Sequence, residues 1–250
     1  LHVRSRRQRQ MCIRDRPVST YYTRLTQRLI SAMTSPMAEG VLYEVDFRLR
    51  PSGNKGPLAT HVDAFRRYQR EEAWTWERMS LTRSRPIVGG QMLMEEVGTI
   101  IREAIDVHRH DDGLAADVAA MRMRIGRDKP ARGPLDLKLI PGGLIDLEFI
   151  AQWAILSGTV ADTLIGASTA NILDALQSAR PELIDRKLAE TMRLFTRIVQ
   201  LNRLGTGSAR TVEDLPRGLA ERMARAIGQE EIAGCLLYTS DAADDSLRVD

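Results

Sequence analysis

The sequence predicts an α+β fold that is mostly helical, with a small piece of β-sheet and its covering helices followed by a helical bundle. Two observations predict this class. Residues 41–50 alternate apolar and charged side chains, as a strand with one buried face does. Along most of the remaining chain, apolar residues recur three and four positions apart, which is the spacing of one helix face. A short sheet and many helices can then form layers around a core.

The first predicted element is a helix over residues 17–35. Pro36 marks its end, because proline cannot continue a helix. The spacing predicts one apolar face along this helix, made of Tyr22, Leu25, Leu29 and Met33.

The second predicted element is the strand over 41–50, in which successive side chains point to opposite faces. The apolar face, with Val45 and Phe47, would pack on a core. The charged face would place Asp46 between charged neighbours roughly 7 Å away along the strand. This pattern fits a wall of a site for a metal-bound, phosphate-bearing ligand. It fits equally well a half-exposed strand whose charges only pair in water.

A loop follows over 51–57, as its proline, glycine and asparagine residues indicate. Further expected elements are a helix over 61–80, a short strand over 82–88, and helices over 91–107, 114–125, 168–176, about 181–204 and 216–227. Turn-forming residues near 108–113 and 126–135 interrupt the helical pattern. We therefore place the first domain at 17–110 and the helical bundle domain at 111–233.

The two ends of the chain differ from the rest. Residues 1–16 and 234–250 resemble translated sequencing-adapter readthrough, and we exclude them from the fold prediction. The alternative is a genuine basic arm and an acidic tail. The first sixteen residues carry a net charge of +5 and the last sixteen −3, which leaves +1 for the body. Both cysteines, Cys12 and Cys235, also lie in these ends.

Composition excludes several functions for the body of the chain. A net charge of +1 removes the electrostatic argument for nucleic-acid binding. A body without cysteine has no disulfide, thiolate metal site or cysteine nucleophile, which fits a reducing compartment. No apolar run approaches the ~18 residues of a membrane span. We expect a cytoplasmic protein with no nucleic-acid or membrane partner.

The charged face of the predicted strand holds the strongest candidates for a site. Asp46 is a candidate ligand for Mg²⁺, because this hard cation prefers oxygen ligands, although one carboxylate cannot complete a metal site. Arg48 and Arg50 are candidate phosphate ligands, since guanidinium groups bind phosphate with two parallel hydrogen bonds. The loop that follows adds the Lys55 ammonium and backbone N–H groups. It lacks the Walker spacing of a P-loop.

Two other polar segments carry weaker signals. The pair Gly142 and Gly143 permits an unusual backbone or the close approach of another element. Asp146 and Glu148 are two positions apart and do not share a helix face, so a shared metal site is not expected. Residues 108–112 contain two histidines and two aspartates, but they fit a polar helix end better than a metal cluster.

Four segments resemble, in their order and spacing, the family of glutamine-synthetase adenylyltransferases: Leu42–Gly53, Ala64–Gln69, Glu72–Glu77 and Gly142–Phe149. The resemblance covers roughly residues 17–233. The family is bifunctional: one half attaches AMP from ATP to a tyrosine of glutamine synthetase, and the other removes it by phosphorolysis. Each half joins a nucleotidyltransferase domain to a helical domain. The resemblance therefore implies that the predicted sheet is a truncated nucleotidyltransferase-type sheet.

The resemblance also implies roles for individual residues. The stretch from Tyr68 to Glu77 resembles the adenylylating, C-terminal half. Asp46 matches a strand carboxylate that helps to hold Mg²⁺ or activates the attacking tyrosine, and Arg48 and Arg50 match arginines on the phosphate side. The family's Gly-Ser turn and paired metal aspartates are expected upstream of residue 17, where this sequence lacks them. We therefore expect this fragment alone to be inactive.

The implied substrate is ATP, the implied cofactor Mg²⁺, and the implied partners glutamine synthetase and a PII regulatory protein. Three alternatives stay open. The chain could come from the de-adenylylating half, or from a related uridylyltransferase that acts on PII proteins. It could also be a non-catalytic helical module that docks glutamine synthetase or a PII protein.

Overall fold

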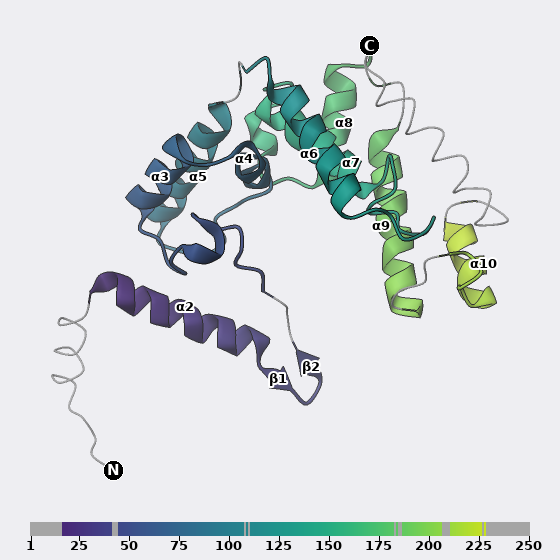
Figure 1. The fold of residues 1–250 in the computed structure, drawn as a ribbon, viewed down its shortest axis with the longest axis horizontal. Helices are drawn as coiled ribbons and strands as arrows, with labels where there is room; N and C mark the ends of the chain where they lie inside the picture. The colour runs from purple at the N-terminus through teal and green to yellow at the C-terminus, as the bar shows by residue number, and fades with distance from the viewer. Residues whose placement is uncertain are drawn as a thin grey trace. The chain divides into compact units, whose positions relative to one another are not determined.

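The computed structural model of this chain describes residues 17–41, 45–107, 109, 111–182, 184, 187–206, 211–226 and 228. These residues are mostly helical and include a small antiparallel sheet (Figure 1), which agrees with the predicted α+β class. The chain divides into two compact units, Leu1–Glu77 and Arg78–Asp250. The domain boundary expected near residue 110 stays a prediction. Within the described residues, no helix is long and apolar enough to cross a membrane.

The first unit begins with α2 (Val18–Thr34), which confirms the helix predicted over 17–35. The apolar face predicted for it is present but not covered, because α2 has no buried residue. Leu25 and Leu29 are 49% and 56% exposed. The apolar spacing thus predicts the helix correctly but not the burial of its face within the described residues.

A two-stranded antiparallel sheet follows α2. It consists of β1 (Pro36–Met37) and β2 (Gly40–Val41). Gly40 has a φ of 107°, which residues with a side chain rarely adopt, so glycine suits this tight reversal. The register pairs Pro36 with Val41 and Met37 with Gly40.

The strand predicted over 41–50 is wrong in its second half. Strand β2 ends at Val41, and the described residues from 45 to 50 form neither strand nor helix. Side chains there bond backbone groups that a strand would give to a neighbour. The Asp46 carboxylate accepts the N–H of Arg48 at 2.9 Å, and the guanidinium of Arg50 takes a backbone carbonyl three residues earlier. A nucleotidyltransferase-type sheet stays a prediction.

The single helix predicted over 61–80 is two helices, α3 (Val62–Glu71) and α4 (Thr75–Leu81). Between them the chain turns, because the N–H groups of Glu72 and Ala73 both donate to the carbonyl oxygen of Tyr68, each at 2.9 Å. A turn preceding α3 holds η1 (Gly53–Lys55), a short 3₁₀ helix.

The second unit is helical throughout its regular elements. The predicted short strand over 82–88 is wrong, since these residues form turns and irregular structure. The helix predicted from about 181 begins at Leu188, because residues 181 and 182 form a turn. The elements are α5 (Gln91–Asp106), α6 (Leu114–Asp128), α7 (Leu144–Leu156), η2 (Asp162–Leu164), α8 (Thr169–Ala179), α9 (Leu188–Gly205) and α10 (Arg217–Ala226).

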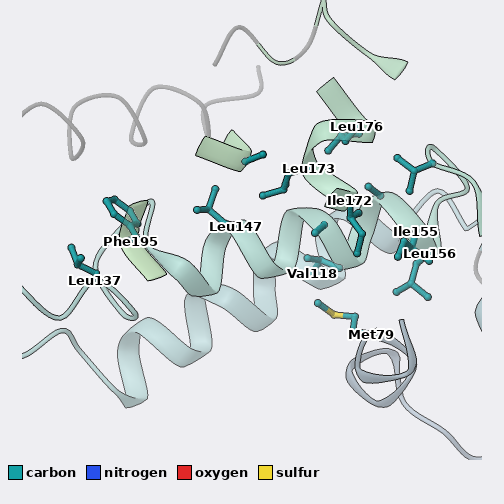
Figure 2. Close-up of a cluster of buried hydrophobic side chains, with 14 of the residues drawn as sticks. Met79, Val118, Leu137, Leu147, Ile155, Leu156, Ile172, Leu173, Leu176 and Phe195 are labelled. Carbon is teal, nitrogen blue, oxygen red and sulfur yellow. The ribbon is translucent and has the colours of Figure 1, made fainter. Parts of the chain in front are cut away.

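Helix α7 forms the centre of the second unit's core. It is apolar around most of its circumference, and α6, α8 and α9 pack against it. Figure 2 shows the buried side chains that these helices contribute, among them Leu147, Ile155, Leu156, Ile172, Leu173, Leu176 and Phe195. Ile155 and Leu173 are fully buried. The predicted helical bundle is therefore present, with its core in this unit.

Candidate functional site

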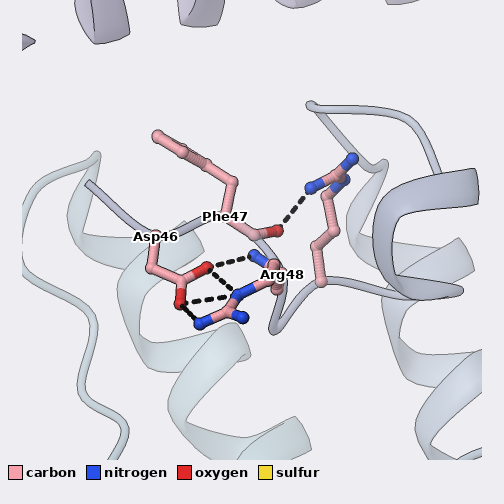
Figure 3. Close-up of polar contacts among 4 residues, drawn as sticks. Asp46, Phe47 and Arg48 are labelled. Carbon is pink, nitrogen blue, oxygen red and sulfur yellow. Dashed lines mark hydrogen bonds and ion pairs between the residues drawn. The ribbon is translucent and has the colours of Figure 1, made fainter. Parts of the chain in front are cut away.

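The acid and the first arginine of the predicted site form an ion pair on the surface of the first unit. Figure 3 shows the Arg48 guanidinium facing both carboxylate oxygens of Asp46. Its Nη2 lies 2.6 Å from Oδ2, and its Nε lies 3.0 Å from Oδ1 and 2.9 Å from Oδ2. The side chains are 53% and 74% exposed. The structure thus brings these two predicted residues together in water-accessible surroundings.

The Arg48 guanidinium also sets the charge state of its partner. Hydrogen bonds from the Arg48 side chain, and then from its backbone N–H, lower the pKa of Asp46 to about 2. The same contact raises the pKa of Arg48. Asp46 is therefore a carboxylate at any physiological pH.

Arg50 contacts backbone carbonyl groups. Its Nη1 lies 2.5 Å from the carbonyl oxygen of Phe47, its Nε 3.2 Å from that of Gly56, and its Nη2 3.3 Å from that of Asn54. The guanidinium thus connects the segment before the loop to the loop's far end. The N–H donors of Arg50, which were predicted to bind phosphate, therefore form hydrogen bonds within the protein.

The loop after Arg50 closes tightly on itself. A Cβ atom on Gly56 would lie 1.9 Å from the carbonyl oxygen of Pro51, so only glycine fits there. The N–H groups of Gly53, Lys55 and Gly56 donate to the carbonyl oxygens of Arg50, Ser52 and Gly53, in that order. These N–H groups are thus engaged within the loop. Lys55, at the end of η1, is exposed and is a cationic group that the loop can offer to an anion.

A set of hydrogen bonds that the sequence did not predict links α3 to α4. The Tyr68 hydroxyl donates to Oε1 of Glu77 at 2.7 Å. The second oxygen of Glu77 accepts the N–H of Trp74 at 2.9 Å. The sequence signal for this contact was the position of Glu77, which lies three residues after Trp74, the residue that precedes α4. A glutamate at that position can accept a hydrogen bond from the backbone N–H of the residue before the helix.

The described residues do not by themselves fit a magnesium site. Both oxygens of Asp46 accept hydrogen bonds from Arg48. Within the described ranges, no group of three or more histidine, cysteine, aspartate or glutamate residues is placed to hold a metal ion. The potential histidine ligands at 108 and 110 lie outside the described residues. Mg²⁺ therefore stays an expectation that rests on the family resemblance.

The second acidic segment has a structural explanation within the second unit. Asp146 is 3% exposed and forms an ion pair with Arg122, whose Nη2 also lies 3.3 Å from the carbonyl oxygen of Leu139. A Cβ on Gly143 would lie 2.6 Å from the carbonyl oxygen of Leu137, which confirms the close approach expected at the glycine pair. These contacts hold the turn that starts α7.

Glu148 pairs separately with Arg83, at 3.3 Å between Oε1 and Nη1. Asp146 and Glu148 therefore have different partners, as their spacing of two positions along a helix indicates. Neither contributes to a shared acidic site within the described part of the second unit.

Comparison with known proteins first gives the class of protein that the chain resembles. A family model described as glutamate-ammonia ligase adenylyltransferase matches residues 3–98, a range that includes Asp46, its loop and the Tyr68 contacts. The match begins within the end that we had excluded, so the boundary at residue 16 stays a prediction.

Curated relatives then define the family more closely. The chain is 48% identical over 216 residues to the bifunctional glutamine synthetase adenylyltransferase/adenylyl-removing enzyme of Brucella suis. These aligned residues make up 86% of this chain and 22% of that protein. The proteins of the same name from Mesorhizobium japonicum and Agrobacterium fabrum are 48% and 46% identical, over 83% and 84% of this chain and 21% and 22% of theirs. The chain belongs to this adenylyltransferase family, and it spans about a fifth of the length of these relatives.

Proposed function

We propose that this chain is a segment of an enzyme that transfers AMP from ATP to a tyrosine of glutamine synthetase, and that it comes from the adenylylating half. The observation that carries this proposal is the identity of 48% over 216 residues to a protein named for adenylyltransferase and adenylyl-removing activities. The resemblance of Tyr68–Glu77 to the adenylylating half supports the choice between the two.

In this proposal Asp46 acts as a fixed negative charge. A general base works best when its pKa lies near the operating pH. With its pKa lowered to about 2 by Arg48, Asp46 would accept a proton poorly from a tyrosine hydroxyl. An electrostatic role, as one oxygen ligand of a Mg²⁺ ion that other residues complete, therefore fits it better than proton transfer.

The cationic groups act on the phosphate side of ATP. Phosphoryl-type transfer depends mainly on positioning and on stabilising charge that develops on phosphate oxygens. Arg48 and Lys55 are exposed and can supply such charge, and Arg50 fixes the loop between them. Glutamine synthetase is the proposed protein substrate, and a PII protein is a proposed regulatory partner.

The test compares the segment with the complete enzyme that contains it. Residues 17–233 and the complete enzyme are incubated with glutamine synthetase, Mg²⁺ and ATP labelled at the α-phosphate. We expect label on glutamine synthetase with the complete enzyme and none with the segment, because one carboxylate cannot complete the metal site. Robust transfer by the segment would contradict the proposed incompleteness.

The same assay tests Asp46. Asp46→Asn in the complete enzyme should lower turnover by several decades, because a charge next to the phosphates is lost while the shape stays. Glu39→Gln is the matched control, since Glu39 is an exposed acid in the turn between β1 and β2 of the same unit. Near-normal turnover of the Asp46 variant would remove Asp46 from the site.

A further inference from the structure

The end of α6 and the loop that leads to α7, which can be followed in Figure 1, are rich in positive charge. From residue 124 to residue 138 the chain carries two aspartates and five cations, which are Arg124, Arg127, Lys129, Arg132 and Lys138. These five side chains form the basic patch. The net charge of residues 124–138 is +3, whereas the body of the chain as a whole carries +1. The positive charge of the body is therefore gathered in this segment.

The cations of the basic patch are exposed and are not neutralised by the fold. All five residues are exposed. Within the described residues, four of them form no ion pair, and Arg127 pairs with the neighbouring Asp128 at 3.8 Å. The side chains of that pair are 77% and 61% exposed, so it contributes little and leaves the guanidinium available. Arg122 differs, because it is 17% exposed and paired with Asp146, and it belongs to the core of the second unit.

The loop that carries the second half of the basic patch is held in place. Leu135 and Leu137 are buried in the core of the second unit. Between them, the Asp136 carboxylate accepts the N–H of Arg132 at 3.2 Å, and the N–H of Asp136 donates to the carbonyl oxygen of Gly133 at 3.0 Å. The backbone that carries these cations is thus fixed before a partner binds, which lowers the conformational entropy lost on binding.

The end of α6 accounts for only part of this charge. A helix C-terminus carries the equivalent of about half a negative charge, which one nearby cation can offset. Arg127 lies in the last turn of α6 and can do so. Lys129, Arg132 and Lys138 lie beyond the helix. Like charges gathered on a surface repel one another, so the remaining cations favour an anionic partner that neutralises them.

The composition of the basic patch fits a protein partner better than a nucleic acid. Nucleic-acid surfaces combine basic stripes with aromatic side chains that stack on bases. Residues 124–138 contain no aromatic residue, and the exposed Asp128 interrupts the cations. Met123, which is 69% exposed, borders the patch and offers an apolar contact of a kind that is enriched at protein interfaces.

We propose that the basic patch is a docking surface for an acidic segment of a partner protein. Glutamate and aspartate side chains of that segment pair with Arg124, Lys129 and Arg132, and the arginines can bind carboxylates with two parallel hydrogen bonds. Charge complementarity of this kind speeds association and sets the choice of partner. The proposal concerns the second unit alone and does not depend on the proposed AMP transfer.

The experiment uses the full chain and, as a probe, a peptide of alternating glutamate and alanine. Hydrogen exchange of residues 124–138 is followed as the peptide is added, and exchange should slow. The peptide concentration at half of this protection measures the affinity of the patch itself, apart from the basic end at residues 1–16. The variant Arg124→Glu/Lys129→Glu/Arg132→Glu should raise that concentration at least tenfold, because attraction becomes repulsion.

The matched control reverses three exposed arginines elsewhere, in the variant Arg24→Glu/Arg28→Glu/Arg203→Glu. Because its net charge changes by the same amount, it should stay within twofold of the wild type if the patch is the site. An equal loss in both variants would assign the binding to overall charge and overturn the proposal. Should the reversed patch variant fold poorly, Arg124→Gln/Lys129→Gln/Arg132→Gln removes the charges without adding acids, and it should lose affinity in the same direction.

Two further probes test the chemistry of the partner. A peptide of alternating lysine and alanine should give no protection of residues 124–138, and equal protection by it would overturn the charge argument. A single-stranded DNA oligonucleotide should protect these residues only at higher concentration than the acidic peptide. Tighter binding of the DNA would make a nucleic acid the partner and overturn the proposal, as would a wild-type chain that the acidic peptide does not protect.

Discussion

Each of the two units contains an ion pair between an aspartate and an arginine, and the two pairs differ in burial. In the first unit, Asp46 and Arg48 form an ion pair that is more than half exposed. In the second, Asp146 and Arg122 form one whose side chains are 3% and 17% exposed. A surface pair contributes little to stability and can exchange its partner for a ligand, whereas a buried pair leaves a costly unpaired charge when one member is lost. Burial, rather than residue type, separates a candidate binding group from a structural one.

The largest effect on stability should therefore come from the buried pair. Arg122→Ala should lower the free energy of unfolding by about 3–5 kcal/mol, because Asp146 would stay buried without its partner. Urea unfolding of this chain measures the change. The double variant Arg122→Met with Asp146→Leu is the control, since a well-packed apolar pair should recover most of the loss. If the double variant is as unstable as the single one, the cost lies in packing rather than in the charge.

The next effect concerns the turn that presents Asp146. Gly143→Ala should cost about 1–3 kcal/mol of unfolding free energy, because the new methyl group would meet the backbone carbonyl of Leu137 and force the turn to move. Thermal unfolding measures it. Gly218→Ala is the matched control, since a Cβ there meets no atom within 4 Å. Equal melting temperatures for the two variants would contradict the close approach at Gly143.

Loss of the exposed ion pair should change the pKa of Asp46 and leave the stability of the protein nearly unchanged. Arg48→Gln should raise the pKa of Asp46 from about 2 toward its ordinary value, because the hydrogen bonds that favour the carboxylate are lost. Any stabilisation from the pair is present above the unfolded-state pKa, and it is lost as the pH falls from about 4 toward 2. Nuclear magnetic resonance titration of the Asp46 carboxyl carbon measures the pKa. An unchanged titration in the variant would show that the pair does not form in solution.

The smallest effect is expected at the loop itself. Ser52→Gly relieves the cost of positive φ, which is about 1–2 kcal/mol for a residue with a side chain, but glycine also makes the unfolded chain more flexible. The net change in unfolding free energy should stay within about 1 kcal/mol. Because the backbone N–H is kept, AMP transfer by the complete enzyme should be unchanged. A large loss of transfer would assign the Ser52 side chain a role that its backbone does not explain.

The helices were predictable from local sequence, and the strand was not. Apolar spacing placed α2, α5 and α8 because a helix satisfies its own backbone hydrogen bonds. A strand needs a neighbour, whereas within residues 45–50 the N–H of Arg48 and the carbonyl oxygen of Phe47 bond nearby side chains. The burial of these residues nevertheless follows the predicted alternation in part. Phe47 is half-buried while Asp46 and Arg48 are exposed, although Leu49, which should have been inward, is 68% exposed.

The sequence by itself determined the helical class, the family resemblance and the closeness of Asp46 to Arg48, because residues two positions apart cannot lie far from each other. Only the tertiary structure decided which acids are buried and how the loop is held. Asp146 meets an arginine 24 positions earlier, and Tyr68 on α3 meets Glu77 on α4. Such contacts depend on how separate elements pack, and packing is a property of the folded chain as a whole rather than of any local pattern.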